Sequence, residues 1–134
     1  MNNYPIGTIS KESTYSVRES MDRLQKILQA KGILVFCRID QQEEAHKAGL
    51  DLSPTELLIF GNPKAGTPVM AAFPLAGLDL PLKILAWQGK DGKVWLSYND
   101  PAYIQQRYAL PDPLVKNLDP GPLVELALSR EHTT

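Results

Sequence analysis

The residues with the most suggestive chemistry are a pair of glycines that follow an apolar segment. The segment LLIF runs into Gly61, and Gly66 follows after four residues, with Thr67 directly behind it. A phosphate-binding loop has the same glycine spacing, but it requires a lysine and then a hydroxyl residue after the second glycine. Thr67 occupies that lysine position, and Pro63 and Pro68 have no backbone N–H to donate to a phosphate. The sequence therefore argues against nucleotide binding.

Two interpretations of this segment remain. A short helix over 68–73, capped by Thr67 and opened by Pro68, would place its N-terminus near Lys64 and hold a small anion. Alternatively, the prolines and glycines form a rigid turn that binds nothing. We favour the turn.

Two aspartates offer candidate acid–base chemistry. Asp79 lies between leucines in the segment GLDLP, and burial would raise its pKa toward the useful range. Asp40 ends an apolar segment and is the second candidate, with Tyr98 or Lys83 assisting either one. Each aspartate also has a structural explanation, because Asp79 can fix a turn and Asp40 can cap a helix that begins near Gln41. No nucleophile–base spacing accompanies them, so we assign no catalytic residue.

Histidine and cysteine are too few to predict a metal site. The chain has two histidines, His46 and His132, and one cysteine, Cys37. A zinc site needs three or four converging ligands, so we predict no metal and no cofactor. Because Cys37 alternates with Val35 and Ile39, we expect its side chain to point into the core as a small apolar group.

The first element that would position these residues is a helix over 17–31. Ser16 and Glu19 form a capping box, and apolar residues then recur at spacings of three and four. Gly32 supplies the left-handed residue that commonly ends a helix.

The remaining elements indicate an α+β fold. The segment at 33–39 is β-branched and aromatic and predicts a central strand, whereas 6–14 predicts an edge strand. Asp91-Gly92 predicts a hairpin. The other predicted elements are strands at 56–60, 82–88 and 93–98 and helices at 41–48, 101–109 and 123–130. We expect a mostly antiparallel sheet of about five strands with helices packed on one face.

The second strand of the hairpin has two unlike faces. Alternation places Val94, Leu96 and Tyr98 toward the core and Trp95, Ser97 and Asn99 on the opposite side. Trp95 is therefore a candidate for a ligand wall or a partner surface, or it packs beneath the C-terminal segment.

Length and composition bound the class of protein. The chain has 134 residues and a net charge of −1, which argues against nucleic-acid and anionic-membrane partners. We expect no signal peptide, no membrane span and a cytoplasmic location. One domain is expected over 1–110. A proline-rich segment over 111–134, with a short terminal helix, would pack on it or exchange between subunits.

Several segments together resemble domain-of-unknown-function family 302. They are FCRID at 36–40, SPTELLIF at 53–60, GNPKAGTPVM at 61–70, GLDLP at 77–81, KILAW at 83–87 and GKVWLSYNDPA at 92–102. The resemblance implies a TATA-binding-protein-like plan of strand, helix, four strands and helix, in small proteins that are often dimeric, and it supplies no catalytic residues. Gln41 and Tyr108 stand where the family pattern commonly has histidine, which argues against metal or proton-transfer roles there.

Three functions follow as hypotheses. The favoured one is a homodimeric domain that binds a small molecule at loops on the sheet edge, through Asn62, Lys64, Thr67, Asp79, Trp95 and Asn99. The second is an enzyme with Asp79 or Asp40 as general acid or base. The third is a purely structural assembly protein, in which Trp95 and the apolar residues Leu123, Val124, Leu126 and Leu128 form a subunit interface.

Overall fold

The computed structural model describes residues 5–130, so His132 lies outside the described residues. In chain order the elements are β1 (Thr8–Ser13), α1 (Val17–Ala30), β2 (Leu34–Asp40), α2 (Gln41–Lys47), β3 (Thr55–Gly61), α3 (Pro63–Ala72), the 3₁₀ helix η1 (Pro74–Leu78), β4 (Leu82–Gln88), β5 (Val94–Asn99), α4 (Pro101–Tyr108), α5 (Asp112–Val115) and α6 (Gly121–Leu128).

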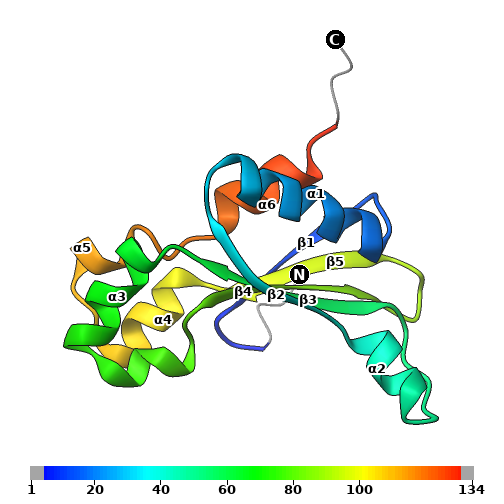
Figure 1. Ribbon diagram of the computed structural model, residues 1–134, viewed down its shortest axis with the longest axis horizontal. Helices are drawn as coiled ribbons and strands as arrows, with labels where there is room; N and C mark the ends of the chain where they lie inside the picture. Colours follow the sequence, from blue (N-terminus) through cyan, green and yellow to red (C-terminus); the bar gives the residue numbers. More distant parts are fainter. Residues whose placement is uncertain (1–4, 131–134) are drawn as a thin grey trace.

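The five strands form one antiparallel sheet in the order β1-β5-β4-β3-β2. Helices α1 and α6 lie side by side over one face, α2 projects from one end, and α3, α4 and α5 gather at the other end (Figure 1). The α+β fold and the antiparallel sheet of five strands are confirmed.

The N-terminal helix forms as its sequence signals predict. The Ser16 hydroxyl accepts a hydrogen bond from the Glu19 backbone N–H at 3.0 Å, and Gly32 follows the helix with φ of +70°. The buried face of α1 carries Val17, Met21, Leu24 and Leu28, which pack against the sheet with Val124 and Ala127 of α6. The last helix thus covers the same sheet face as the first.

A second, smaller core lies at the end of the sheet. Val69 of α3, Ala76 of η1, Ile104 of α4, and Leu80, Leu110 and Leu118 of the connecting segments pack together there. This core fixes α3 relative to the ends of β3 and β4 and therefore shapes the cavities described below.

The strand at 33–39 was expected to be central, and the structure corrects this. β2 pairs only with β3 and forms an edge of the sheet. Its apolar composition reflects partial burial, since Leu34 and Phe36 are each about half exposed.

Cys37 is exposed instead of pointing into the core. A β-bulge between Val35 and Cys37 inserts Phe36 as an extra residue, so that Val35 faces Phe60 and Cys37 faces Ile59. Because a bulge interrupts strict alternation, Cys37 lies on the face opposite Val35.

The segment 61–68 is neither a turn nor a loop before a helix at Pro68. Helix α3 begins at Pro63, and the Asn62 side chain caps it by accepting a hydrogen bond from the Lys64 backbone N–H at 2.9 Å. Pro68 lies inside this helix. The sequence contains two pairs of a capping residue and a proline, and the helix uses the first one, Asn62-Pro63.

Candidate functional site

An apolar cavity of about 250 Å³ opens where the ends of β2, β3 and β4 meet α3. Phe36, Met70, Leu80 and Leu118 form much of its wall, and we call it the apolar cavity. Few polar side chains line it, among them Asn62, Thr67 and Asn117. An apolar wall with a few polar groups is the usual form of a ligand pocket.

A second cavity of about 400 Å³ adjoins the first. Its charged lining residues are Lys64, Lys116 and Asp119, and we call it the lysine cavity. Its larger apolar lining residues belong to, or pack against, the core beneath α1 and α6. Both cavities have Gly61, Asn62, Ala65, Leu82 and Asn117 in their walls, so one ligand can reach both.

Two glycines keep the apolar cavity open. A Cβ atom at Gly61 would lie 3.7 Å from Phe36 and from Pro81, both of which line the cavity. A Cβ atom at Gly66 would meet only Met70, at 3.8 Å. These are ordinary van der Waals distances, so packing does not demand glycine at either position, and a side chain would narrow the cavity without a clash.

The polar side chains around the lysine cavity are available to a ligand. Within residues 5–130, the side chains of Lys64, Lys116 and Asn117 make no hydrogen bond or ion pair. Asp119 differs, because its carboxylate accepts a hydrogen bond from the Gly121 backbone N–H at 2.9 Å. The unpaired groups therefore leave an excess of positive charge on this side.

Asp79 lies outside both cavities and has fixed partners. Its carboxylate accepts hydrogen bonds from the Arg107 guanidinium at 2.9 Å and from the Tyr108 hydroxyl at 2.5 Å, and its side chain is 14% exposed. Burial and the hydrogen bond to Asp79 raise the pKa of Tyr108. This arrangement ties the η1–β4 connection to α4.

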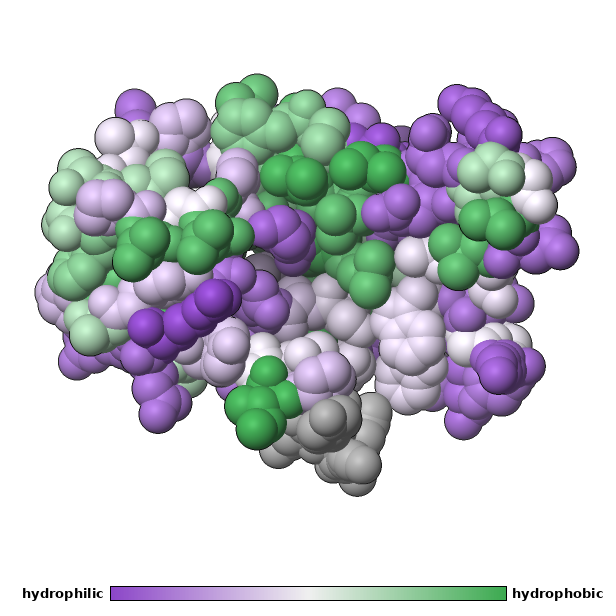
Figure 2. All heavy atoms as spheres, turned by 90° about the horizontal axis from the view of Figure 1, so that it is seen from below, coloured by the Kyte–Doolittle hydropathy of each residue, from purple (hydrophilic) through white to green (hydrophobic). Residues whose placement is uncertain are grey.

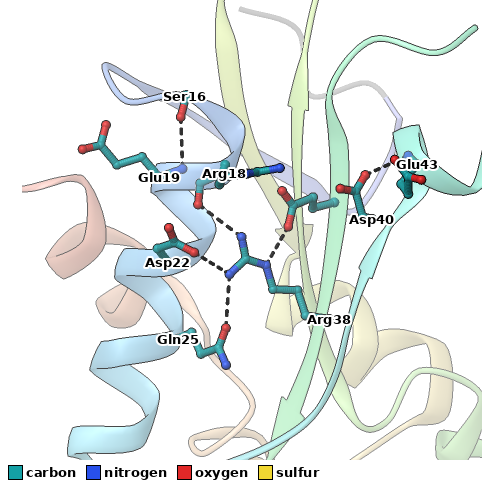
Figure 3. Close-up of polar contacts among 9 residues, drawn as sticks. Ser16, Arg18, Glu19, Asp22, Gln25, Arg38, Asp40 and Glu43 are labelled. Carbon is teal, nitrogen blue, oxygen red and sulfur yellow. Dashed lines mark hydrogen bonds and ion pairs between the residues drawn. The ribbon is translucent and has the colours of Figure 1, made fainter. Parts of the chain in front are cut away.

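Asp40 caps α2 and belongs to a neighbourhood of structural polar contacts (Figure 3). Close by, the Arg38 guanidinium donates hydrogen bonds to Glu56 at 2.6 Å, to Asp22 at 2.7 Å, and to Gln25 and the Arg18 carbonyl oxygen at 3.2 Å. Although burial opposes it, these partners raise the pKa of Arg38. Arg38 thereby fastens α1 to β2 and β3.

Trp95 and Asn99 line neither cavity and lie on the sheet face that α1 and α6 leave uncovered. Trp95 stacks on Trp87 with ring centroids 6.4 Å apart. The Trp87 indole N–H donates to the Ser97 hydroxyl at 2.8 Å, and Ser97 also bonds Ser10 at 2.7 Å. The burial of Val94, Leu96 and Tyr98 on the other face agrees with the predicted alternation.

The structure brings together three of the six residues predicted to bind a ligand. Asn62, Lys64 and Thr67 line the cavities, whereas Asp79, Trp95 and Asn99 line neither. No sequence pattern predicted the other cavity residues Phe36, Met70, Lys116 and Asn117. An exposed Phe36 could have been inferred only from the bulge, and the 116–118 segment reaches Asn62 through contacts distant in sequence.

The fold and this arrangement define a class of single-sheet α+β domain with a cavity at one sheet end. Residues 9–119 match the family described as "Domain of unknown function DUF302", and the chain belongs to this family. The crystal structure of an uncharacterized conserved DUF302 protein from Bacillus stearothermophilus has a similar fold, with a TM-score of 0.74. The similarity covers 92% of this chain and 96% of that one at 21% identity.

Curated relatives are similar to most of this chain over part of their own length. "Fluoride-specific ion channel FluC 1" of Brucella suis is 47% identical over 104 residues, which are 78% of this chain and 41% of that protein. "Fluoride-specific ion channel FluC 2" of Brucella melitensis is equally similar over 38% of its length. This chain thus spans about two fifths of these relatives. Among residues 5–130, no helix has the length and apolarity to cross a bilayer.

Proposed function

We propose that this protein binds a small organic molecule in the apolar cavity. The observation that carries the proposal is the pair of glycines in the cavity wall. Gly66 lies within α3, where alanine would favour the helix by about 0.5–1 kcal/mol, and a Cβ atom there would meet no clash. A glycine that lowers the stability of its helix and leaves a cavity open is typical of a binding site, where function is favoured over stability.

The volume of the cavity limits the size of the ligand. An apolar cavity of about 150 Å³ accepts a molecule the size of benzene. At about 250 Å³, the apolar cavity accommodates one ring with a short side arm. Buried ligand surface of this kind contributes about 25 cal/mol per Å².

A ligand-observed NMR screen of small aromatic and branched aliphatic compounds tests this proposal. Fluoride belongs in the screen because the Brucella relatives carry fluoride-channel names. We expect organic ligands to bind and to be displaced in Met70→Trp, whose larger side chain would fill the cavity. A panel without binders, or binders that Met70→Trp leaves unaffected, would refute the site.

We also propose that the protein forms a homodimer through the uncovered face of its sheet. Five strands at about 4.8 Å spacing and about 20 Å length give a face of roughly 500 Å². Apolar side chains gather over part of this face (Figure 2). Register places Leu57, Ile59, Leu85, Trp87 and Trp95 on it.

The charge of this sheet face is compatible with a second copy, and the β2 edge adds to its area. The face carries one acidic residue, Glu12, and one basic residue, Lys83, so that two copies would not repel each other. A stable interface buries about 800 Å² per partner, and the half-exposed Leu34 and Phe36 at the β2 edge extend the apolar area.

Light scattering on the purified protein measures its oligomeric state. We expect a dimer, and we expect Ile59→Lys to give a folded monomer because it places a second cation beside Lys83, its cross-strand neighbour, in the apolar part of the sheet face. Leu126→Lys is the matched control, since Leu126 is 47% exposed on α6, away from that face. A monomeric wild type, or a dimer that Ile59→Lys leaves intact, would overturn the proposed interface.

The general acid–base hypothesis receives less support from the contacts. Asp40 caps α2, and Asp79 is held by Arg107 and Tyr108 outside both cavities. Neither carboxylate is placed against a ligand in the apolar cavity.

A further inference from the structure

We propose that the ligand is an organic monoanion: an aromatic or branched alkyl group that carries a carboxylate. Its apolar group would fill the apolar cavity, and its carboxylate would extend into the lysine cavity. This inference rests on the proposed function and specifies the chemistry of that ligand.

The charges of the lysine cavity favour an anion. Two ammonium groups, those of Lys64 and Lys116, and one carboxylate, that of Asp119, line it and leave a net positive charge of one. The Asp119 carboxylate is engaged by the Gly121 N–H, whereas neither lysine has an ion-pair partner among residues 5–130. A single carboxylate would neutralise this excess.

The position of Lys64 has no explanation in helix stability. Lys64 lies in the first turn of α3, where the partial positive charge of the helix end disfavours a cation. The Asn62 side chain already accepts a hydrogen bond from the backbone N–H of Lys64. The same helix end favours an anion near it, so a bound carboxylate would turn an unfavourable placement into a favourable one.

Amide groups at the junction of the cavities can orient the carboxylate. Asn62 and Asn117 line both cavities, and the Asn117 side chain makes no hydrogen bond within the described part of the chain. Asn62 uses its side-chain oxygen as the cap, which leaves its NH₂ group to donate. Hydrogen bonds from amide and ammonium donors to a carboxylate are stronger than those to a neutral oxygen.

The apolar walls and the charged rim together predict selectivity by charge among molecules of equal shape. A neutral analogue would gain the apolar burial alone. A cationic analogue would meet Lys64 and Lys116. Selectivity for the carboxylate is therefore a property that separates this inference from simple hydrophobic binding.

Three compounds of similar shape test it: 3-phenylpropionate, 3-phenylpropan-1-ol and 3-phenylpropylammonium, titrated into the full chain by protein NMR. We expect the carboxylate to bind at least about tenfold more tightly than the alcohol, and the ammonium compound most weakly. Lys64→Gln and Lys116→Gln should each weaken the carboxylate severalfold and leave the alcohol unchanged. Lys90→Gln, in the hairpin turn and outside both cavities, is the matched control and should change neither.

Each outcome has a definite consequence. Equal binding of carboxylate and alcohol, tighter binding of the ammonium compound, or insensitivity to both lysine variants would overturn the anion inference. If the alcohol still binds and Met70→Trp abolishes its binding, the proposed function survives that failure. If none of the three binds, both the inference and the aromatic ligand site fail together.

Discussion

Replacing Gly66 with alanine should make this protein more stable and a poorer binder at the same time. Gly66 is the fourth residue of α3, its backbone amide donates to the Asn62 carbonyl oxygen at 3.0 Å, and its φ is not positive. Alanine can adopt this conformation without strain. The new methyl group would contact Met70 at 3.8 Å, an ordinary van der Waals distance.

The magnitudes follow from helix propensity and from the cavity. Alanine in place of glycine inside a helix raises the free energy of unfolding by about 0.5–1 kcal/mol. In a chain of this length that corresponds to a rise in Tm of about 2–4 °C. A ligand that fills the cavity would meet the added methyl group, and overpacking costs about 1–3 kcal/mol, or at least about fivefold in affinity.

Two assays on one variant decide the matter. Urea denaturation gives the free energy of unfolding, and NMR titration gives the affinity for 3-phenylpropionate. Gly77→Ala is the control, because Gly77 lies in η1, lines neither cavity and would place its Cβ 3.6 Å from the Met70 sulfur. A Gly66→Ala protein that binds as tightly as wild type would refute the reading of this glycine as a cavity residue. A less stable one would show that the helix requires glycine.

Three further predictions concern the polar contacts and the second glycine. Gly61→Ala should weaken ligand binding without unfolding the protein, measured by the same titration, because its Cβ atom fits between cavity residues at 3.7 Å. Arg38→Met should lower the free energy of unfolding, measured by urea denaturation, by about 3 kcal/mol, because it leaves Glu56, whose side chain is 8% exposed, without its partner. Adding Glu56→Gln to that variant should recover at least about 1 kcal/mol. Tyr108→Phe should reduce the slope with which the free energy of unfolding falls at alkaline pH. Burial and the hydrogen bond to Asp79 raise the pKa of Tyr108 above 10.0, so the folded state holds the phenolic proton more tightly than the unfolded chain does. That contribution is complete below pH 10 and is lost as the pH rises above it, and denaturation at several alkaline pH values measures the slope. A wild type and a Tyr108→Phe variant with identical slopes would contradict this assignment.

The parts of the fold that the sequence predicted are those set by local chemistry. The capping residue Ser16 and the left-handed Gly32 act on the helix that lies between them, so their signals are local in the sequence. The hairpin register likewise depends on Asp91-Gly92 and on alternation within one strand, and Gly92 has φ of +85°. Signals of this kind need no knowledge of the tertiary structure.

The incorrect predictions concern features that are set by contacts between residues distant in the sequence. Asn62-Pro63 and Thr67-Pro68 are equally good helix starts on local grounds, and packing of Val69 into the second core accompanies the earlier one. The bulge at Phe36 exists only in the pairing of β2 with β3, so alternation misplaced Cys37.

The candidate site divides in the same way. Asn62, Lys64 and Thr67 follow one another along a single segment, and its unusual glycines and prolines identified it. Phe36 and Asn117 reach that segment from other parts of the chain, and no spacing in the sequence announces them.

The two proposals share a residue and therefore make a joint prediction. Phe36, which is 49% exposed, lines the apolar cavity and belongs to the β2 edge beside the uncovered sheet face. If a second copy covers that edge, it closes one wall of the cavity, and ligand binding and dimerisation become thermodynamically coupled. Linkage then requires the ligand to tighten the dimer by the same factor by which the dimer tightens the ligand. Because a dimer has two cavities, sedimentation measurements of the dimer dissociation constant, with and without saturating 3-phenylpropionate, give the square of that factor. A factor of one would place the cavity outside the interface and make the two surfaces independent.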